Sequence, residues 1–326
     1  MSLVEVQDLK TWYPVKTGLF SAKKHVKALD GVSFNIEKGE TVGLVGESGC
    51  GKSTLGRTLM CLERHKSGAY RIDGVDISGL SGSELRKARS SFQMIFQDPY
   101  GSLNPRMTVC RMLDEVLCLH TKFSTQERKD RIAELLKMVG LPLQAMERYP
   151  HQFSGGQRQR IGIARSLAVN PKFIVADEPV SALDVSVQAQ IINLLRDIQS
   201  KTSIAYLFIA HDLAVVEHIS SRILVMYLGR IVESGPAREI CSNPLHPYTK
   251  ALISAVPSID PATRRNRIFL PGDVPSPLDP PHGCPFHPRC PIARARCSEE
   301  VPALFPADSS GERHSACFFA SEVPAM

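Results

Sequence analysis

Short apolar runs alternate with longer amphipathic segments over roughly the first two thirds of the chain. The runs have the length and composition of buried strands and lie at residues 41–45, 173–176, 206–210 and 223–227. The segments between them are long enough to form helices that cover a sheet. The pattern therefore predicts an α/β domain built on a mainly parallel sheet.

Two of the predicted helices have clear apolar stripes. The first begins after Ser124, which can form a capping box with Glu127, and ends at Gly140. The second covers residues 185–200. We expect both stripes to pack in the core. Their members are Ile132, Leu135, Leu136 and Val139 in the first helix, and Val187, Ile191, Leu194, Leu195 and Ile198 in the second.

Proline becomes frequent in the last part of the chain, where 13 of the 23 prolines lie between residues 257 and 324. Proline lacks a backbone N–H and restricts φ, so long helices and strands are not expected there. The composition predicts a main domain over residues 1–235 and a separate, loop-rich appendage over residues 236–326.

The composition of the chain indicates in which cellular compartment the protein works. No apolar run approaches the roughly 18 residues of a membrane span, and the first residues lack the features of a secretory leader. The net charge of +6 is too small to argue for nucleic acid or for a membrane surface. We therefore expect a cytoplasmic protein, and nothing in its charge indicates a nucleic-acid partner.

The stretch from Gly46 to Thr54 fits the phosphate-loop pattern G-x-x-x-x-G-K-[ST] without a gap. It follows a predicted strand and precedes a predicted helix at residues 55–63. Bare N–H groups and the helix dipole favour a phosphate, Lys52 adds a cation, and Ser53 offers a hydroxyl to Mg²⁺. The expected nucleotide-binding residues are Gly46, Glu47, Ser48, Gly49, Cys50, Gly51, Lys52, Ser53 and Thr54.

A second element of a phosphate site follows the predicted strand at residues 173–176. Asp177 ends this strand, an arrangement that places a carboxylate beside Mg²⁺. Glu178 comes next and can act as the general base that polarises an attacking water. We predict a nucleoside triphosphate hydrolase.

A third element is the run Ser154-Gly155-Gly156, which opens a long predicted helix at residues 157–169. Its bare N–H groups and positive dipole end form another phosphate-binding device. Because one nucleotide needs only one phosphate loop, this second device predicts that two chains share nucleotides.

Together these motifs resemble those of the ATPase subunits of ABC transporters. Ser154-Gly155-Gly156-Gln157 matches the signature motif, with Phe153 where many members have Leu. The other matches are Gln97 in the Q-loop, Ser181-Ala182-Leu183-Asp184 as the D-loop, His211 as the switch histidine, and Tyr13 as the aromatic residue that stacks on adenine, with Trp12 as an alternative.

The resemblance implies a P-loop NTPase fold with a RecA-like core, an antiparallel β edge and a helical subdomain near residues 98–165. It further implies that two such domains close head to tail around two ATP molecules. The implied roles are phosphate and Mg²⁺ binding by Lys52, Ser53 and Asp177, Mg²⁺ sensing by Gln97, activation of water by Glu178, γ-phosphate contact by His211, and capping of the partner's ATP by Ser154 and Gly156.

Two stretches narrow the resemblance further. Residues 97–106 and 243–249 resemble dipeptide and oligopeptide importer ATPases, in particular the second, F-type subunit. This implies a paralogous ATPase partner, two permeases and an extracytoplasmic binding protein, at the cytoplasmic face of a bacterial inner membrane. Three alternatives stay open: import of nickel, glutathione or another small solute, a soluble ABC ATPase acting on nucleic acid or the ribosome, and a metal- or redox-sensing module switched by ATP.

Four of the nine cysteines fall in the proline-rich tail, at Cys284, Cys290, Cys297 and Cys317. Four thiols suit an iron–sulfur cluster or a structural zinc, although zinc cysteines usually come in closer pairs. Free thiols are the third alternative. The family resemblance implies a [4Fe–4S] cluster at these positions. The remaining cysteines, read as small buried or incidental residues, are Cys50, Cys61, Cys110, Cys118 and Cys241.

Overall fold

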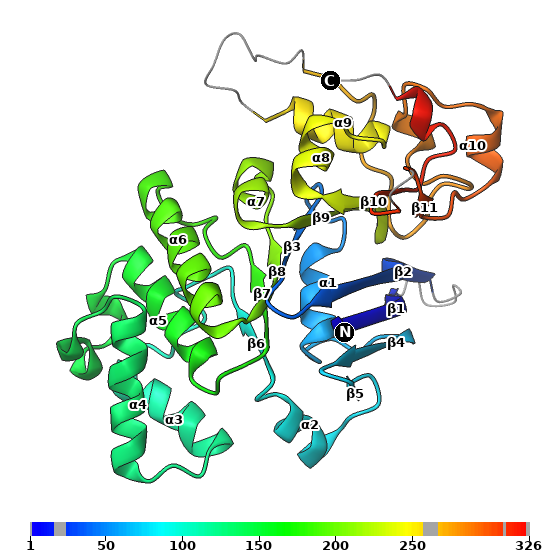
Figure 1. Ribbon diagram of the computed structural model, residues 1–326. Helices are drawn as coiled ribbons and strands as arrows, with labels where there is room; N and C mark the ends of the chain where they lie inside the picture. Colours follow the sequence, from blue (N-terminus) through cyan, green and yellow to red (C-terminus); the bar gives the residue numbers. More distant parts are fainter. Residues whose placement is uncertain (1, 16–23, 257–266, 309–310, 324–326) are drawn as a thin grey trace. The chain divides into compact units, whose positions relative to one another are not determined.

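The computed structural model describes residues 2–15, 24–256, 267–308 and 311–323 (Figure 1). Its internal contacts divide the chain into two units, and each is built from separate stretches of sequence. The first unit contains residues 1–5, 35–40 and 71–208, and the second contains residues 6–34, 41–70 and 209–326. No helix among the described residues is both long and apolar enough to cross a membrane.

The first unit combines part of a sheet with a group of helices. Its strands β6 (Phe92–Ile95), β7 (Phe173–Asp177) and β8 (Ala205–Ile209) are neighbours in the order β8-β7-β6, and β6 and β7 are parallel. Helices α3 (Val109–His120), α4 (Thr125–Met138) and α5 (Gly155–Leu167) pack against one another, and α5 also contacts β6 (Figure 1). The remaining elements are β5 (Val75–Asp76), α2 (Gly82–Ala88), α6 (Val185–Thr202), and the 3-10 helices Leu143–Glu147 and Pro150–Gln152.

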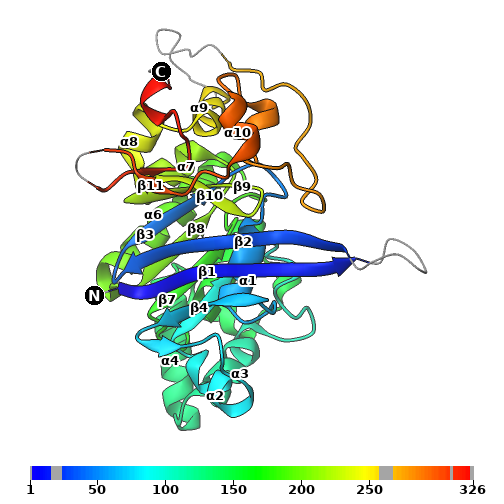
Figure 2. The ribbon, with the colours of Figure 1, turned by 90° about the vertical axis from the view of Figure 1, so that its right-hand side faces the viewer.

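The second unit holds the strands β11 (Phe305–Pro306), β12 (His314–Ser315), β10 (Arg230–Pro236), β9 (Arg222–Tyr227) and β3 (Thr41–Val45), in that order. β3 and β9 are parallel, whereas β9 and β10 form an antiparallel pair. A second sheet contains the neighbours β2 (Lys24–Glu37), β1 (Ser2–Val15) and β4 (Ser67–Ile72), and Figure 2 shows β1 and β2 side by side. The helices are α1 (Lys52–Leu59), α7 (Leu213–Ile219), α8 (Ala237–Ser242), α9 (Pro247–Ser254), α10 (Ala295–Glu299), and the 3-10 turns His287–Arg289 and Ala320–Glu322.

The predicted strands and helices are present, with boundaries shifted by up to four residues. The capping box of α4 is confirmed, because the Ser124 hydroxyl accepts from the Glu127 N–H at 3.3 Å and the Glu127 carboxylate accepts from the Ser124 N–H. The apolar stripe of α6 is only partly core. Val187 and Leu194 are half-buried, and Ile192 is buried in addition to the predicted Ile191, Leu195 and Ile198.

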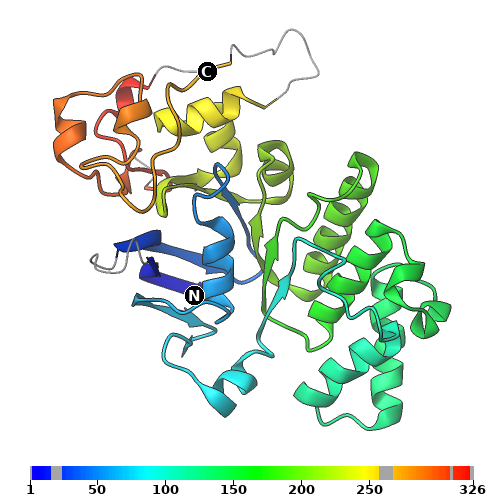
Figure 3. The ribbon, with the colours of Figure 1, turned by 180° about the vertical axis from the view of Figure 1, so that it is seen from behind.

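The last part of the chain begins more regularly than expected, with α8 and α9, and then has only short elements among its described residues. In Figure 3 this part, coloured yellow to red, gathers around α8, α9 and α10. A buried carboxylate ties it to β10. Glu233, which is 1% exposed, accepts from the N–H groups of Leu245 at 2.7 Å and His246 at 2.9 Å, and Arg313 lies 3.5 Å away.

This carboxylate generates a stability prediction. Glu233→Ala leaves two buried N–H groups without their acceptor and removes one of the partners of the buried Arg313 guanidinium, which keeps the Asn243 carbonyl, so we expect a loss of roughly 3 kcal/mol in the free energy of unfolding. Glu239 is the matched control because it also faces Arg313, at 3.7 Å, but is 52% exposed. Glu239→Ala should change stability by no more than about 0.5 kcal/mol. Urea unfolding of both variants tests the contrast, and equal losses would contradict it.

Candidate nucleotide site

The phosphate loop joins the buried strand β3 to the start of α1. Gly51 caps α1 with a left-handed φ of 110°, and a Cβ atom there would lie 2.3 Å from the Ala28 carbonyl oxygen. A Cβ atom on Gly46 would lie 2.2 Å from the Met226 carbonyl oxygen. Both distances are too short for any side chain, so the loop keeps its course only with glycine at these positions.

The side chain of Lys52 lies inside this loop. It is 6% exposed, and its ammonium donates to the carbonyl oxygens of Gly46 at 2.7 Å and Glu47 at 3.0 Å. The thiol of Cys50 is buried beside it, and burial raises the pKa of that thiol. The predicted phosphate-binding lysine thus lies within the ring of backbone groups that the motif supplies.

Two side chains from the last part of the chain also form hydrogen bonds with this loop. The Glu47 N–H donates to the Tyr248 hydroxyl at 2.8 Å. The Arg289 guanidinium donates to both Glu47 carboxylate oxygens, at 2.9 and 3.2 Å, and this hydrogen bonding raises the pKa of Arg289. Sequence reasoning missed Tyr248 and Arg289, because they lie 201 and 242 residues from Glu47 and belong to no phosphate-site motif.

The two aromatic candidates for adenine stacking have different surroundings. The Tyr13 hydroxyl interacts with Thr54 of α1 and with Glu63, and partial burial raises the pKa of Tyr13. The ammonium of Lys66 instead lies over the ring of Trp12, 3.4 Å from the ring centre, and the ammonium of Lys27 lies 5.2 Å from the same centre. A base could stack on that face of Trp12 only after displacing Lys66.

The acidic pair at the end of β7 has the expected local arrangement. Asp177 is 3% exposed at the end of a wholly buried strand. Glu178 follows with a φ of 45°, a left-handed conformation that is uncommon outside glycine and that is concentrated at functional sites. The side-chain amide of Gln97 donates to its carboxylate at 2.8 Å. The structure therefore brings together Gln97 and Glu178, which lie 81 residues apart in the sequence.

The signature run forms the N-terminus of α5. The Ser154 hydroxyl accepts from the Gln157 N–H at 3.3 Å, and the Gln157 side chain accepts from the Ser154 N–H at 3.1 Å. A Cβ atom on Gly156 would lie 2.5 Å from Val187 of α6, which explains both this glycine and the intermediate burial of Val187. Ser154 and Gln157 are exposed, so the helix start faces outward.

The predicted site residues fall in different units. The phosphate loop, Tyr13 and His211 belong to the second unit, whereas Gln97, the acidic pair, the signature run and Asp184 belong to the first. Asp184 is the N-cap residue of α6, and His211 is exposed beyond the end of β8. Each group of residues is therefore organised by its own unit.

The four tail cysteines line one small cavity of about 20 Å³ in the second unit. Burial raises the pKa of Cys284 and of Cys317 to about 11, and it raises the pKa of Cys290 as well. Among the described residues, no three His, Cys, Asp or Glu side chains are grouped as ligands of a metal ion. The four cysteines therefore line one cavity.

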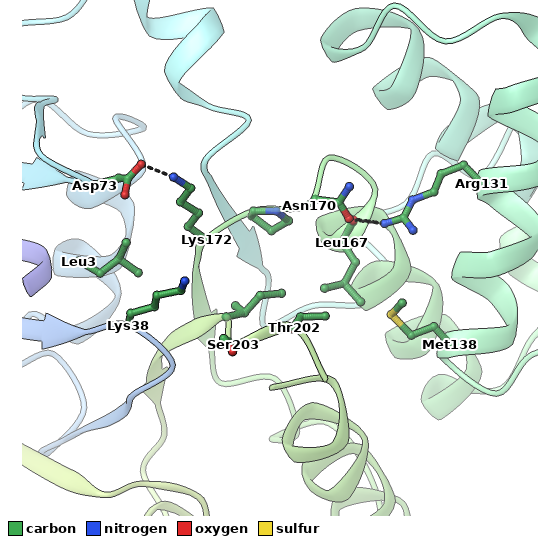
Figure 4. A pocket seen from close by; sticks show the side chains of 12 residues that line it. Leu3, Lys38, Asp73, Arg131, Met138, Leu167, Asn170, Lys172, Thr202 and Ser203 are labelled. Carbon is green, nitrogen blue, oxygen red and sulfur yellow. Dashed lines mark hydrogen bonds and ion pairs between the residues drawn. The ribbon is translucent and has the colours of Figure 1, made fainter. Parts of the chain in front are cut away.

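A cavity of about 450 Å³ in the first unit contains none of the predicted site residues. Figure 4 shows two interactions within its lining, since Lys172 pairs with Asp73 and Arg131 donates to Asn170. We assign it no role in nucleotide binding.

Comparison with known proteins agrees with this geometry. Residues 29–181 match the family model of ABC transporters, and residues 232–297 match that of the oligopeptide/dipeptide transporter C-terminal region. A dimeric ATP-binding cassette in a post-hydrolysis state, bound to ADP and phosphate, superposes with a TM-score of 0.64 at 32% identity over 72% of this chain and 99% of that one. Fold and site therefore define an ATPase of the ABC class.

Two relatives match at nearly full length. The oligopeptide transport ATP-binding protein AppF of Bacillus subtilis is 52% identical over 92% of this chain and 93% of its own. The di/tripeptide transport ATP-binding protein DppF of Pseudomonas aeruginosa is 49% identical over 98% of both chains. The chain belongs to the ABC transporter ATP-binding proteins that carry the oligopeptide/dipeptide C-terminal region.

The surroundings of the two aromatic residues predict their separate effects on ATP affinity. Tyr13→Ala should raise the Kd for ATP about tenfold, since stacking of a base on an aromatic ring contributes about 1–3 kcal/mol, and Tyr13→Phe should retain the affinity. Trp12→Ala should raise the Kd by no more than about twofold, because its ring is covered by Lys66. Calorimetric titration with ATP measures both effects. The reverse order would identify Trp12 as the stacking residue.

Proposed function

We propose that this protein is the ATP-hydrolysing subunit of an ABC importer that takes up dipeptides or oligopeptides. The observation that carries the proposal is the likeness of about 50% to two peptide transport ATP-binding proteins over nearly the whole chain, the C-terminal region included. The complete set of motifs supports hydrolysis, because every residue type needed to hold and attack ATP is present at the expected position.

In this proposal the phosphate loop, with Lys52 and Ser53, holds the phosphates, and Asp177 completes the Mg²⁺ site. Glu178 polarises the attacking water, and its contact with Gln97 joins the base to the segment that enters the helical region. Reorganisation of that contact would connect hydrolysis to movement of α3, α4 and α5. His211 acts on the γ-phosphate.

The outward-facing start of α5 supports a shared site. Ser154 and Gly156 would cap ATP held by a second, paralogous ATPase, whose own signature run would cap ATP held here, and Asp184 would lie at the junction between the two chains. A helix N-terminus with exposed N–H groups is suited to a phosphate that another chain presents.

The remaining partners follow from the proposed import. We propose two permeases and an extracytoplasmic binding protein, with this subunit at the cytoplasmic face of a bacterial inner membrane. Exposed aromatic side chains in the helical region, including Tyr100 at 63% and Tyr149 at 40%, are suited to contact a permease.

We also propose the division into an ATPase domain over residues 1–235, with a helical subdomain near 98–165, and an extension over 236–326. The ranges of the two family matches support it.

We propose that Cys284, Cys290, Cys297 and Cys317 hold a [4Fe–4S] cluster. The donor chemistry supports this proposal, because four thiols line one cavity and each can bind a different iron. When bound, the cluster would crosslink a segment that has little regular structure and so supply folding free energy.

The proposed base generates a test of the whole function. In a complex assembled with its permeases, Glu178→Gln should still bind ATP but hydrolyse it about 100-fold more slowly or worse, and uptake of a labelled dipeptide should fall equally. Near-normal hydrolysis in the variant would remove Glu178 from its role. Hydrolysis coupled to nickel or glutathione uptake, with no response to peptides, would contradict the peptide cargo.

The cluster proposal has a separate test. Protein purified without oxygen should be brown and contain about four iron and four sulfide per chain. Cys290→Ser should lower both contents, whereas Cys118→Ser, at an exposed cysteine outside the cavity, should not. A colourless protein with stoichiometric zinc, or with four freely labelled thiols, would contradict the cluster.

A further inference from the structure

The C-terminal extension contacts the phosphate loop through two side chains, those of Arg289 and Tyr248. Arg289 is 7% exposed and forms a two-pronged ion pair with Glu47, the second residue of the loop. The Tyr248 hydroxyl accepts from the Glu47 N–H, so the extension holds both the backbone and the side chain of this loop residue. Gly46, Gly49 and Gly51 make the neighbouring backbone adaptable, and external anchors restrict it.

Arg289 lies in the chain segment between two cysteines of the cavity. It ends a 3-10 turn (His287–Arg289) that lies between Cys284 and Cys290. In this turn the His287 N–H donates to the Cys284 carbonyl at 3.0 Å, and the Cys290 N–H donates to the His287 carbonyl at 3.2 Å. The turn that carries Arg289 is therefore hydrogen-bonded to the backbone of both cysteines.

Packing makes this connection stiff. Phe286, which is 1% exposed, lines the cavity and lies with its ring 5.3 Å from that of Tyr227 and 5.5 Å from that of Tyr248. The Arg289 guanidinium also donates to the Tyr227 hydroxyl, at 3.5 Å. The cavity wall and the groups that hold Glu47 are thus one packed aromatic cluster, and such interiors transmit small shifts.

We propose that Arg289 is a positioning residue that sets the conformation of the phosphate loop and couples it to the state of the cysteine site. A loop held in its binding conformation pays less ordering entropy when it binds phosphate, so the ion pair strengthens ATP binding. Coupling is reciprocal, so occupancy of the cysteine site and ATP binding reinforce each other. The part that concerns the cysteine site rests on the proposed [4Fe–4S] cluster.

The first test measures the Kd for ATP of the full-length protein by calorimetry. Arg289→Met should raise it about tenfold, within the usual range of coupling between sites. Arg289→Lys should be intermediate, because an ammonium cannot make the two-pronged contact. Glu47→Gln should weaken binding similarly, and the double variant with Arg289→Met should be no worse than either single one. Lys172→Met, in an exposed pair with Asp73 in the first unit, is the control and should bind as the parent does.

Melting temperatures separate positioning from loss of structure. A normal Kd in folded Arg289→Met, or additive losses in the double variant, would overturn the proposal. A loss of ATP affinity that follows the loss of melting temperature across the variants, Arg289→Lys included, would do the same.

The second test compares protein as purified with protein whose metal has been removed by a chelator. Removal should weaken ATP binding in the parent but have no further effect in Arg289→Met. An equal effect in both would overturn the coupling through Arg289. Protein that contains no metal as purified would overturn the cluster and its coupling, whereas the Arg289→Met measurement would still decide whether this residue positions the loop.

Discussion

The lack of room for side chains around the phosphate loop is the constraint on which the rest of the structure depends. Gly46 and Gly51 approach neighbouring carbonyl oxygens so closely that a Cβ atom would collide with them. The backbone therefore turns tightly from β3 into α1, and Lys52 lies inside the turn. A loop rich in glycine has little packing of its own, so its shape also depends on what surrounds it, including Tyr248 and Arg289.

The acidic pair, unlike the phosphate loop, depends on a strained backbone rather than on glycine. Glu178 adopts a left-handed conformation directly after a fully buried strand, and Gln97 holds its carboxylate. The strand cannot shift without exposing apolar residues, so the strain stays at the residue after Asp177. The start of α5 is exposed and has the character of a phosphate site, and in the proposed function it caps ATP held by a second chain.

Local features were predictable because their physics is local. The capping box at Ser124 and the buried strand at residues 41–45 were predicted from neighbouring residues and are confirmed. The phosphate loop was recognisable since its glycines and lysine lie within nine positions. The stripe of α6 was less accurate, because Val187 packs against Gly156, a residue far from it in the sequence. Periodicity identifies a helix face but not the partner that covers it.

By itself, the sequence determined the chemistry of this protein: the phosphate loop, the acidic pair, the signature run and the four tail cysteines are all identifiable from residue types and spacing. Only the tertiary structure decided which distant groups contact these motifs. Glu47 meets Arg289 across 242 residues, and the four cysteines reach one cavity, because chain folding brings them together. Such contacts depend on the packing of whole elements, which no short pattern encodes.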